Sequence, residues 1–274
     1  MTNSIGSNLS FFQTKINVDI SAYDEAFLRN IVDSRKIELA IVTNKEYLNY
    51  LGSCEEEAIV FRSRLTNSYS EFFRNPLTFA YLEQIILPQL IEKKRIKKEN
   101  QIRIWSAACA SGQEAYSMAI LCDELIESKK SDINYLIFAT DIDTEEVSKA
   151  KKGIYNAATL GKVTLKRIQT YFTPTGNDFI IAPQLRNQID FSVFNLLSDQ
   201  GSCPPPSIYG NFDLVFCSNL LFYYEPESRM RILEKIGNSL AKDGYLITGE
   251  TEREIIKGNN YREVFVNSAI FQKK

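Results

Sequence analysis

The feature that most constrains the fold is the segment Arg103–Tyr116, RIWSAACASGQEAY. An apolar strand runs into a turn of small residues, Ala107 to Gly112, and a helical pattern follows from Gln113 to Ile126. A second apolar run ends in Asp141. Small residues let the backbone approach a ligand, and an acid at the end of the second strand can accept hydrogen bonds from both ribose hydroxyls. This pattern predicts a nucleoside site, although the turn alone suits any parallel α/β domain equally well.

The residues that are missing narrow the choice of nucleoside. Gly112 is the only glycine of the turn, so the G-x-G-x-x-G pattern of a dinucleotide site is absent, and the chain has no G-x-x-x-x-G-K-[ST] motif. The nearby acids Glu114 and Asp141 favour a ligand that has a cationic centre and no phosphates. S-adenosylmethionine, an adenosine joined to a sulfonium and an amino acid, has this character.

Strands and helices alternate from Gln101 onward, which predicts an α/β fold with a doubly wound, mostly parallel sheet. The expected strands are 102–106, 135–140, 190–194, 214–217 and 245–249, and the expected helices are 113–126, 144–151 and 226–240. Asp143 with Glu146 forms a plausible capping pair for the second helix. Residues 263–272 alternate like an edge hairpin, and residues 171–192 read as an inserted hairpin or small β-subdomain.

The first 97 residues are expected to form a helical N-terminal subdomain, followed by one large domain over residues 98–274. Residues 1–20 are polar and suggest a loosely attached arm. Pro88 is expected to break a helix, because proline lacks a backbone N–H. The basic stretch Lys93–Lys98 reads as a solvated linker to the first strand.

Composition excludes several classes of function. Histidine is absent, which rules out Ser-His or Cys-His catalysis and histidine metal ligands, and the five cysteines lack C-x-x-C spacing, so we expect neither a metal site nor disulfides. Lys and Arg number 32 against 34 Asp and Glu, which gives no attraction to nucleic acid. No apolar run is long enough for membrane insertion, and no signal peptide is present. We expect a cytoplasmic monomer.

Five segments, in their order and spacing, resemble the CheR-type chemotaxis-receptor glutamate methyltransferases. They are TNSYSEFFR (Thr66–Arg74), WSAACASGQEAYS, ATDIDTEEVSKAKKGIY, DFSVFNLL and FDLVFCSNLLFYY. A phenylalanine pair before arginine, one helix ahead of the nucleotide domain, is characteristic of this family. The resemblance covers residues 38–252 and implies S-adenosylmethionine as methyl donor and S-adenosylhomocysteine as product. It also implies a partner, the cytoplasmic region of a chemotaxis receptor or a similar acidic helical protein.

Asp141 is our candidate for the ribose hydroxyls, with a helix cap as the weaker alternative. The resemblance implies that Glu114 contacts the cofactor, although a first-turn glutamate can equally satisfy a helix dipole. The full set of expected cofactor residues is Ser68, Ser70, Arg74, Ala108, Gly112, Glu114, Asp141, Asn195, Leu196, Asn219 and Leu220. Within it, Asn195 and Leu196 would meet the adenine, and Asn219 and Leu220 the methionine end. Taken singly, the two leucines are more often core residues.

Arg74 and Tyr223 are the candidate catalytic residues. Phe72 and Phe73 are expected to anchor a helix from which the Arg74 guanidinium holds a substrate carboxylate in a bidentate manner. The alternative is a surface arginine on an amphipathic helix. Tyr223 would close the site beside the substrate, unless it is a buried core aromatic.

Three departures from the family pattern concern the substrate. Ser218 stands where the family has arginine, and GETE (Gly249–Glu252) replaces a histidine-bearing segment. The N-terminal subdomain is short and has scattered bases. These departures leave open a methyltransferase for another protein carboxylate or a small acid, and a cofactor-binding regulatory module without activity.

Overall fold

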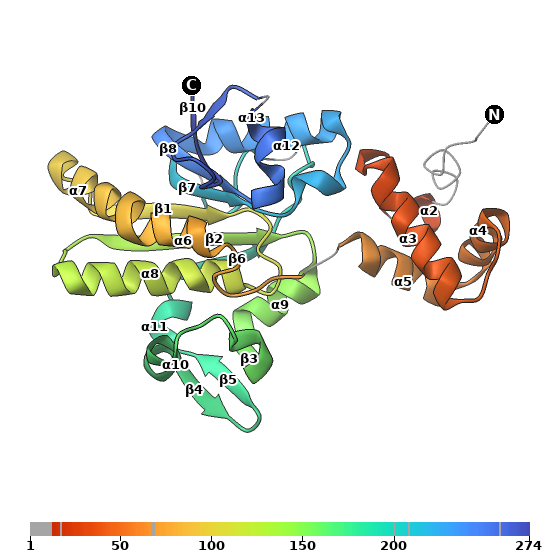
Figure 1. The fold of residues 1–274 in the computed structure, drawn as a ribbon, viewed down its shortest axis with the longest axis horizontal. Coiled ribbons are helices and arrows are strands. Elements are labelled where there is room, and N and C mark those ends of the chain that lie inside the picture. Colours follow the sequence, from red (N-terminus) through yellow and green to blue (C-terminus); the bar gives the residue numbers. More distant parts are fainter. Residues whose placement is uncertain (1–12, 17, 67–68, 200, 208, 258) are drawn as a thin grey trace. The chain divides into compact units, whose positions relative to one another are not determined.

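The structure, a computed structural model, describes residues 13–16, 18–66, 69–199, 201–207, 209–257 and 259–274. The described residues form two compact units, each with a hydrophobic core of its own. The helical unit contains the chain up to residue 67 and the segment Leu221–Ile232. The sheet unit contains Ser68–Leu220 and Leu233–Lys274 (Figure 1). Residues 1–12 of the expected arm lie outside the described part of the chain.

The division between the units lies before Ser68 rather than near residue 97. The reason is that α6 (Pro76–Tyr81) and α7 (Leu87–Lys97) bury their apolar residues in the core of the sheet unit. Phe79 and Leu90, for example, belong to the same buried cluster as Ile104 of the first strand. Helical periodicity is a local signal, and it does not reveal which core a helix joins.

Pro88 does not break the helix. A π-helical segment, Leu82–Ile86, joins α6 to α7, and the residues at both junctions keep right-handed helical backbone angles. The Leu87 N–H bonds to the carbonyl of Leu82, five residues back, and this wider turn accommodates a proline in the next position.

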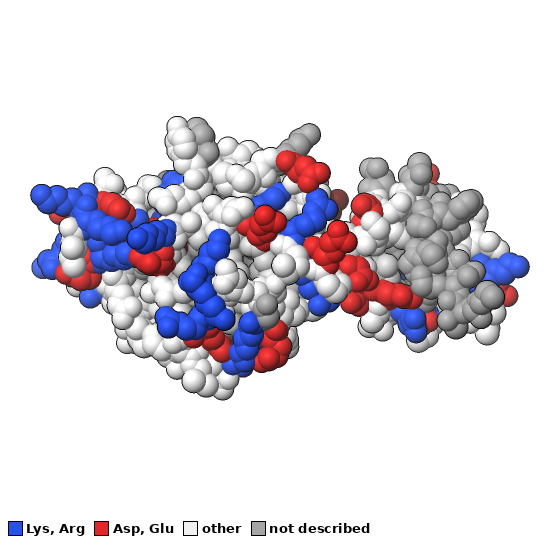
Figure 2. Space-filling view, turned by 90° about the horizontal axis from the view of Figure 1, so that it is seen from above, with Lys and Arg blue, Asp and Glu red and all other residues white. Residues whose placement is uncertain are grey.

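The basic stretch Lys93–Lys98 is also not a linker, because it forms the last turn of α7 and its cap. The Lys94 side chain is buried and pairs with Asp213 at 3.0 Å and with Glu99 at 2.7 Å. Figure 2 shows Lys and Arg side chains gathered at this end of the sheet unit. Cations at a helix C-terminus stabilise it against the negative end of the helix dipole.

The sheet unit is built on seven strands in the order β6-β2-β1-β7-β8-β10-β9. They are β1 (Gln101–Ser106), β2 (Asn134–Asp141), β6 (Ile189–Val193), β7 (Phe212–Cys217), β8 (Leu240–Thr248), β9 (Tyr261–Glu263) and β10 (Ile270–Lys273). Strands β6, β2, β1, β7 and β8 pair in parallel, and β10 pairs antiparallel with β8 and β9. The expected doubly wound, mostly parallel sheet with an antiparallel edge is therefore confirmed.

The central strands β1 and β7 are largely buried on both faces. Ile102 and Ile104 of β1 join the core under α7, α8 (Gln113–Lys129) and α9 (Thr144–Lys152). Side chains alternate along a strand, so Trp105 faces the opposite side, where it packs against Phe194 and Phe212. The later part of α12 (Pro226–Ser239) covers that side, with the Lys235 ammonium 5.2 Å from the ring centre of Phe194.

The inserted β-subdomain is larger than residues 171–192. Its three strands have the order β3-β5-β4 and are β3 (Ile154–Asn156), β4 (Phe172–Thr175) and β5 (Asp178–Ile181). Short helices, η3 (Ala157–Leu160), α10 (Leu165–Tyr171) and α11 (Pro183–Arg186), accompany them. The hairpin turn at Gly176 has φ +62°, as expected of its Thr-Gly-Asn sequence. Figure 1 shows this small sheet apart from the main one, beside α11.

The helical unit consists of α2 (Gln13–Ile16), η1 (Ile20–Ala22), α3 (Glu25–Glu38), α4 (Asn44–Ser53), α5 (Glu55–Leu65) and η4 (Leu221–Tyr223). Ile16 and Ile20 are buried in its core, so this part of the expected arm is packed rather than loose. The segment after η4 joins the unit through a bridge between Tyr23 and Tyr224. The remaining short elements, η5 (Glu250–Glu252) and α13 (Arg253–Lys257), follow β8. None of the described helices is long and apolar enough to cross a bilayer.

Candidate functional site

The small-residue turn after β1 is clamped between two neighbouring strands. The Ala107 N–H donates to the carbonyl of Phe216 at 2.8 Å, and the Cys109 N–H donates to the carbonyl of Thr140 at 2.9 Å. These bonds hold the turn at the carboxyl edge of the parallel sheet, where ligands of such folds bind.

Gly112 is required at the end of this turn. Its φ is +93°, and a Cβ atom would lie 3.0 Å from the Ala150 Cβ and 3.2 Å from the Tyr155 hydroxyl. The Tyr155 hydroxyl donates to the carbonyl of Ser111 at 2.7 Å, which ties β3 to the turn. The close approach of α9 and β3 therefore leaves room for glycine alone at this position. Helix α8 begins here, and no side chain caps its N-terminal amides in the described residues.

Asp141 lies at the end of β2 and contacts the turn directly. Its carboxylate accepts from the N–H of Ala110 at 2.8 Å and from the N–H of Asp143 at 3.0 Å. Burial raises the pKa of Asp141, and these two backbone donors oppose that rise. The cap of α9 is Asp143, which accepts from the N–H groups of Glu145 and Glu146, so Asp141 does not have the alternative role of a helix cap.

Glu114 occupies the first turn of α8, beside the end of β1. The Ser106 hydroxyl donates to its carboxylate at 2.6 Å, and Ser218 supplies a further hydrogen bond. Withdrawal from water is the largest cause of a rise in the pKa of Glu114 to about 7, and the nearby Glu252 carboxylate adds to it. The family departure at Ser218 thus places a small hydroxyl against Glu114.

Asn219 and Leu220 follow β7 and are held by a residue that sequence analysis did not select. The Glu252 carboxylate accepts from the N–H of Asn219 at 2.6 Å, from the N–H of Leu220 at 2.7 Å and from the N–H of Gly249 at 2.8 Å. Glu252 is fully buried. The sequence signal that could have pointed to Glu252 is the acidic GETE segment directly after a buried strand. Sequence analysis treated this segment only as a departure from the family pattern.

Phe72 and Phe73 anchor the segment before α6, as expected, but the segment is a turn rather than a helix. The Phe73 N–H donates to the Ser117 hydroxyl on α8 at 3.0 Å, with Phe73 at φ +50°. The Phe72 ring packs edge to face on Tyr155, with 5.0 Å between ring centres. The turn is therefore fixed to the first half of α8, which begins at the nucleotide turn.

Arg74 directly follows this anchored pair and is partly exposed. Its guanidinium donates to the carbonyl of Tyr69 at 3.1 Å and lies 5.3 Å from the centre of the Tyr69 ring. It is close enough to Glu114 to lower the pKa of that carboxyl. Ser70 is partly buried in the same extended segment, whereas Ser68 lies outside the described residues.

The other candidates separate into two groups. Asn195 is exposed after β6 and accepts from the N–H of Leu197 at 2.9 Å, and the neighbouring Leu196 is 8% exposed. Ala108 lies partly exposed in the turn. Tyr223 belongs to the helical unit, where its ring centre lies 4.6 Å from that of Phe27. The structure thus places the candidates at the ends of β1, β2, β6 and β7 at the carboxyl edge of the sheet, and it gives Tyr223 packing partners within the helical unit.

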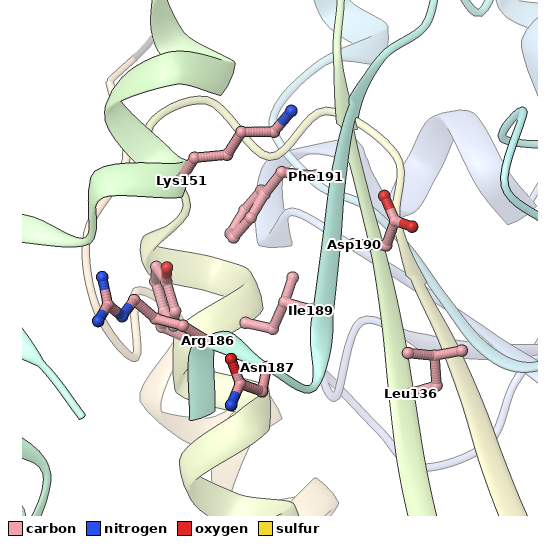
Figure 3. A pocket seen from close by; sticks show the side chains of 8 residues that line it. Leu136, Lys151, Arg186, Asn187, Ile189, Asp190 and Phe191 are labelled. Atoms are coloured by element: carbon pink, nitrogen blue, oxygen red, sulfur yellow. The ribbon is translucent and has the colours of Figure 1, made fainter. Parts of the chain in front are cut away.

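A separate pocket of about 370 Å³ opens beside the first half of β6 (Figure 3). Its lining residues are Tyr116, Leu136, Lys151, Arg186, Asn187, Ile189, Asp190 and Phe191. None of the candidate site residues lines this pocket.

The comparison with known families decides the assignment. The profile of the CheR methyltransferase, SAM binding domain, matches residues 68–270. The chain belongs to the CheR methyltransferase family. Its sheet unit starts at Ser68, where the match begins. The expected family, enzyme class and cofactor, S-adenosylmethionine, are confirmed.

Curated relatives of this CheR methyltransferase extend the similarity over the helical unit. A chemotaxis protein methyltransferase from Listeria monocytogenes is 28% identical over 261 residues, which is 94% of this chain and 92% of the relative. Chemotaxis protein methyltransferase 1 from Pseudomonas aeruginosa is 34% identical over 195 residues, 69% of this chain and 67% of the relative. The chemotaxis protein methyltransferase from Escherichia coli is 32% identical over 212 residues, 75% of this chain and 68% of the relative.

The residues at the strand ends fit S-adenosylmethionine. The turn ends in a glycine whose missing Cβ leaves backbone accessible, and the part-buried Asp141 carboxylate lies at the end of β2, beside the turn. A second carboxylate, that of Glu114, lies in the helix that follows β1, the neighbour of β2. No lysine or arginine of the described residues is hydrogen-bonded to it. Such a pair suits a ligand with two hydroxyls and a cationic centre.

Proposed function

We propose that this CheR methyltransferase methylates glutamate side chains on the cytoplasmic region of a chemotaxis receptor. The observation that carries the proposal is the family match over the whole sheet unit, together with relatives named as chemotaxis methyltransferases. The chemistry agrees with the composition. A glutamate carboxylate is ionised at neutral pH and can attack a methyl group without a general base, so a chain without histidine can perform the reaction.

In this proposal, the buried carboxylates and strand-end loops bind the cofactor. Asp141 accepts from the ribose hydroxyls, Glu114 pairs with the amino group, and Asn195 with Leu196 covers the adenine. The loop at Asn219 and Leu220 meets the methionine end, and the hydroxyl of Ser70 contributes from the segment before α6. Ser68, outside the described residues, stays in the proposed cofactor set. The bound cofactor supplies an activated methyl group. The support for these roles is the position of the described residues at the carboxyl ends of β1, β2, β6 and β7.

Arg74 is the proposed substrate-orienting residue. Its guanidinium can bind a carboxylate through two parallel hydrogen bonds, and its backbone directly follows the turn that Ser117 anchors. Holding two reactants in line can contribute about 7–11 kcal/mol to catalysis, and the enzyme needs little else for this reaction. Tyr223 is proposed to lie beside the substrate.

The test is transfer of a labelled methyl group from S-adenosylmethionine to purified receptor cytoplasmic fragments. A methyl ester of a carboxylate is cleaved by mild base, whereas N-methyl and C-methyl groups are not. We expect label on the receptor fragment that leaves as methanol at high pH. Label that remains after base treatment would refute carboxyl methylation, and a receptor fragment that stays unlabelled would refute the receptor as substrate.

A further inference from the structure

Glu252 connects the ends of two neighbouring strands. It closes η5, which follows β8, and it accepts hydrogen bonds from the Asn219 and Leu220 amides beyond β7. The same carboxylate accepts from the N–H of Gly249. The fully buried Glu252 side chain thus supplies the acceptor for two part-buried amides and for the buried amide of Gly249.

The geometry requires a carboxylate at this position. Asn219 has φ +58°, an uncommon conformation for a residue with a side chain, and two adjacent amides point at the two oxygens of Glu252. A glutamine would direct its NH2 group at one of these donors, because an amide has a single acceptor oxygen. A Cβ on Gly249 would lie 2.8 Å from both Asn219 Oδ1 and Glu252 Oε2, so the packing leaves no room for rearrangement.

Glu252 also lies near Glu114, because Ser218 bonds to the Glu114 carboxylate and the N–H of the next residue, Asn219, bonds to the Glu252 carboxylate at 2.6 Å. The groups that face Glu114 are the hydroxyls of Ser106 and Ser218, the Arg74 guanidinium and the Glu252 carboxylate. The thiols of Cys109 and Cys217 also lie near, and burial raises the pKa of both, so they are neutral. The Arg74 charge lowers the pKa of Glu114 and the Glu252 charge raises it, so these two residues have opposite effects on its ionisation.

We propose that Glu252 is a positioning residue of the cofactor site, which fixes the Asn219–Leu220 backbone and repels negative charge from Glu114. This role rests on the proposed contacts of Glu114 and of the Asn219–Leu220 loop with the cofactor. When the cofactor's amino group binds, Glu114 must be ionised, and the Glu252 charge moves this ionisation to higher pH. Glu252 thus sets both the affinity of the site and the pH above which that affinity is reached.

The test measures S-adenosylhomocysteine affinity by calorimetry between about pH 5.5 and 8.5. For Glu252→Gln we expect an affinity at high pH about tenfold or more below wild type, because one strong acceptor is lost. We also expect the midpoint of the pH dependence to move to lower pH, because the repelling charge is gone. Glu252→Asp keeps the charge with a shorter reach, so it should lower the affinity while the midpoint stays near that of wild type.

Asp213 provides a matched control at the opposite end of β7. It is a buried carboxylate that accepts a backbone amide, that of Arg103 at 2.9 Å, and pairs with Lys94. Asp213→Asn should lower the melting temperature but keep both the affinity and the midpoint. A Glu252→Gln variant with the wild-type midpoint would overturn the charge effect, and wild-type affinity at high pH would overturn the positioning role. Absence of binding by the wild-type protein would instead refute the proposed cofactor contacts.

Discussion

The ionisation of Glu114 is the property of the site most open to direct measurement. The pKa of its carboxyl is raised from 4.5 to about 7, first by burial and then by the neighbouring Glu252. Free protein is therefore partly protonated at Glu114 near neutral pH. Because the folded-state value lies above the unfolded value, this group lowers the stability of the free protein progressively as the pH rises from about 4.5 to about 7.

Pairing with the cationic amino group of the cofactor or its product reverses this preference. Binding of S-adenosylhomocysteine favours ionised Glu114, so it releases a proton between about pH 5 and 7. We expect the affinity to fall as the pH decreases below about 7 and to be constant above it. Calorimetry in two buffers of different ionisation enthalpy measures the released proton. Equal affinity at pH 5.5 and 8 would show that Glu114 does not pair with the ligand.

Asp141 offers a test of ribose binding with a control two residues away. Asp141→Ala should weaken S-adenosylhomocysteine binding by about 1.5–3 kcal/mol, the size of a lost hydrogen bond to a charged group. Asp143→Ala removes the cap of α9 and should cost about 1 kcal/mol of stability with little change in affinity. Equal affinities of the Asp141 variant and the wild type would remove Asp141 from the site.

Substitution of Arg74 should lower the rate of methyl transfer more than it weakens the binding of the cofactor. If its guanidinium orients the substrate carboxylate, Arg74→Ala should lower the methyl-transfer rate on the order of a hundredfold or more. Arg74→Lys keeps the charge but lacks the planar fork, so we expect partial rescue. Single-turnover rates at saturating cofactor measure the effect. A rate within a few-fold of wild type for the alanine variant would leave Arg74 with a structural role.

At the scale of elements, the strand-turn-helix unit depends on how tightly α9 and β3 approach the turn. The turn's amides are fixed by β2 and β7, and the Tyr155 hydroxyl reaches its carbonyl from β3. The FFR turn is fixed to α8 by the Ser117 hydroxyl, which itself donates to the Gln113 carbonyl. The site is therefore assembled from several elements that pack around one helix N-terminus.

Alanine substitutions at two glycines with positive φ distinguish the cost of backbone strain from the cost of close packing. In Gly112→Ala the new Cβ would be strained by the positive φ and would also contact neighbouring atoms closely. In Gly176→Ala only the backbone strain applies, because φ is +62° and no atom lies within 4 Å of the new Cβ. We expect Gly176→Ala to cost about 1–2 kcal/mol of stability and to keep cofactor affinity. Gly112→Ala should cost more, by about 1–3 kcal/mol, and should weaken S-adenosylhomocysteine binding. Chemical denaturation and calorimetry compare the two, and equal losses would contradict the role of close packing.

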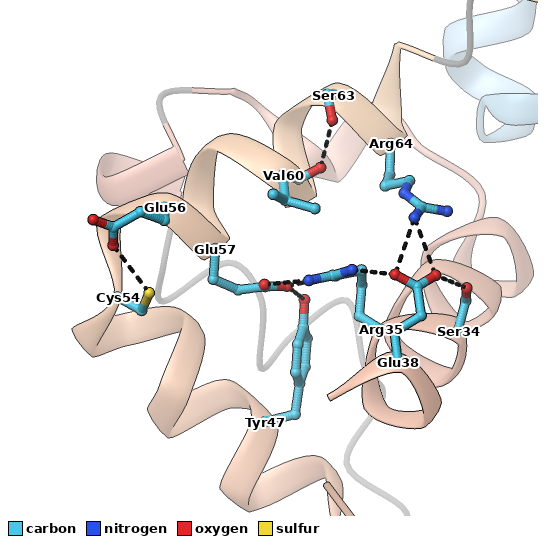
Figure 4. A network of polar contacts seen from close by, with 10 residues as sticks. All are labelled: Ser34, Arg35, Glu38, Tyr47, Cys54, Glu56, Glu57, Val60, Ser63 and Arg64. Carbon is cyan, nitrogen blue, oxygen red and sulfur yellow. Dashed lines mark hydrogen bonds and ion pairs between the residues drawn. The ribbon is translucent and has the colours of Figure 1, made fainter. Parts of the chain in front are cut away.

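At the scale of the molecule, each unit has its own core, and the helical unit has a buried polar network (Figure 4). Glu57 accepts from Arg35 at 2.9 and 2.6 Å and from the Tyr47 hydroxyl at 2.8 Å. The hydrogen bonds with Glu57 are the largest cause of a raised pKa of Arg35, while burial is the largest cause of a raised pKa of Tyr47. Arg35 also contacts Glu38, which receives a further bond from Arg64.

Loss of Glu57 should destabilise the helical unit selectively. Glu57→Ala leaves the buried Arg35 guanidinium without its main partner, which typically costs about 3–5 kcal/mol. Amides of α3 and α5 should lose protection in hydrogen exchange, while those of β1 and β2 keep theirs. Glu56→Ala, at an exposed neighbouring position, should change stability by less than about 0.5 kcal/mol. Loss of protection in β1 together with α3 would show that the units unfold as one.

The sequence alone determined the alternation of strands and helices, the mostly parallel character of the sheet and the edge at which a ligand site is expected. Strand and helix periodicities are local, and the carboxyl ends of parallel strands must meet at one edge. Asp141 was therefore proposed as a site residue from its position at the end of a strand, whereas the cofactor contact of Glu114 was proposed from the family resemblance. The motifs around Arg74 and Asn219 also indicated the family from the sequence alone, because the residues of each motif are contiguous in the chain.

Only the tertiary structure decided which core each helix joins and which distant groups meet. Helix α7 joins the sheet unit because its apolar face packs on β1, and Lys94 is buried because Asp213, far along the chain, lies opposite it. The FFR segment is a turn because Ser117 and Tyr155 hold it, although its local pattern suits a helix. Glu252 acquires its role from amides 32 and 33 residues earlier in the chain. Burial and hydrogen bonding between segments distant in sequence depend on how the elements pack, and a local sequence pattern does not predict that packing.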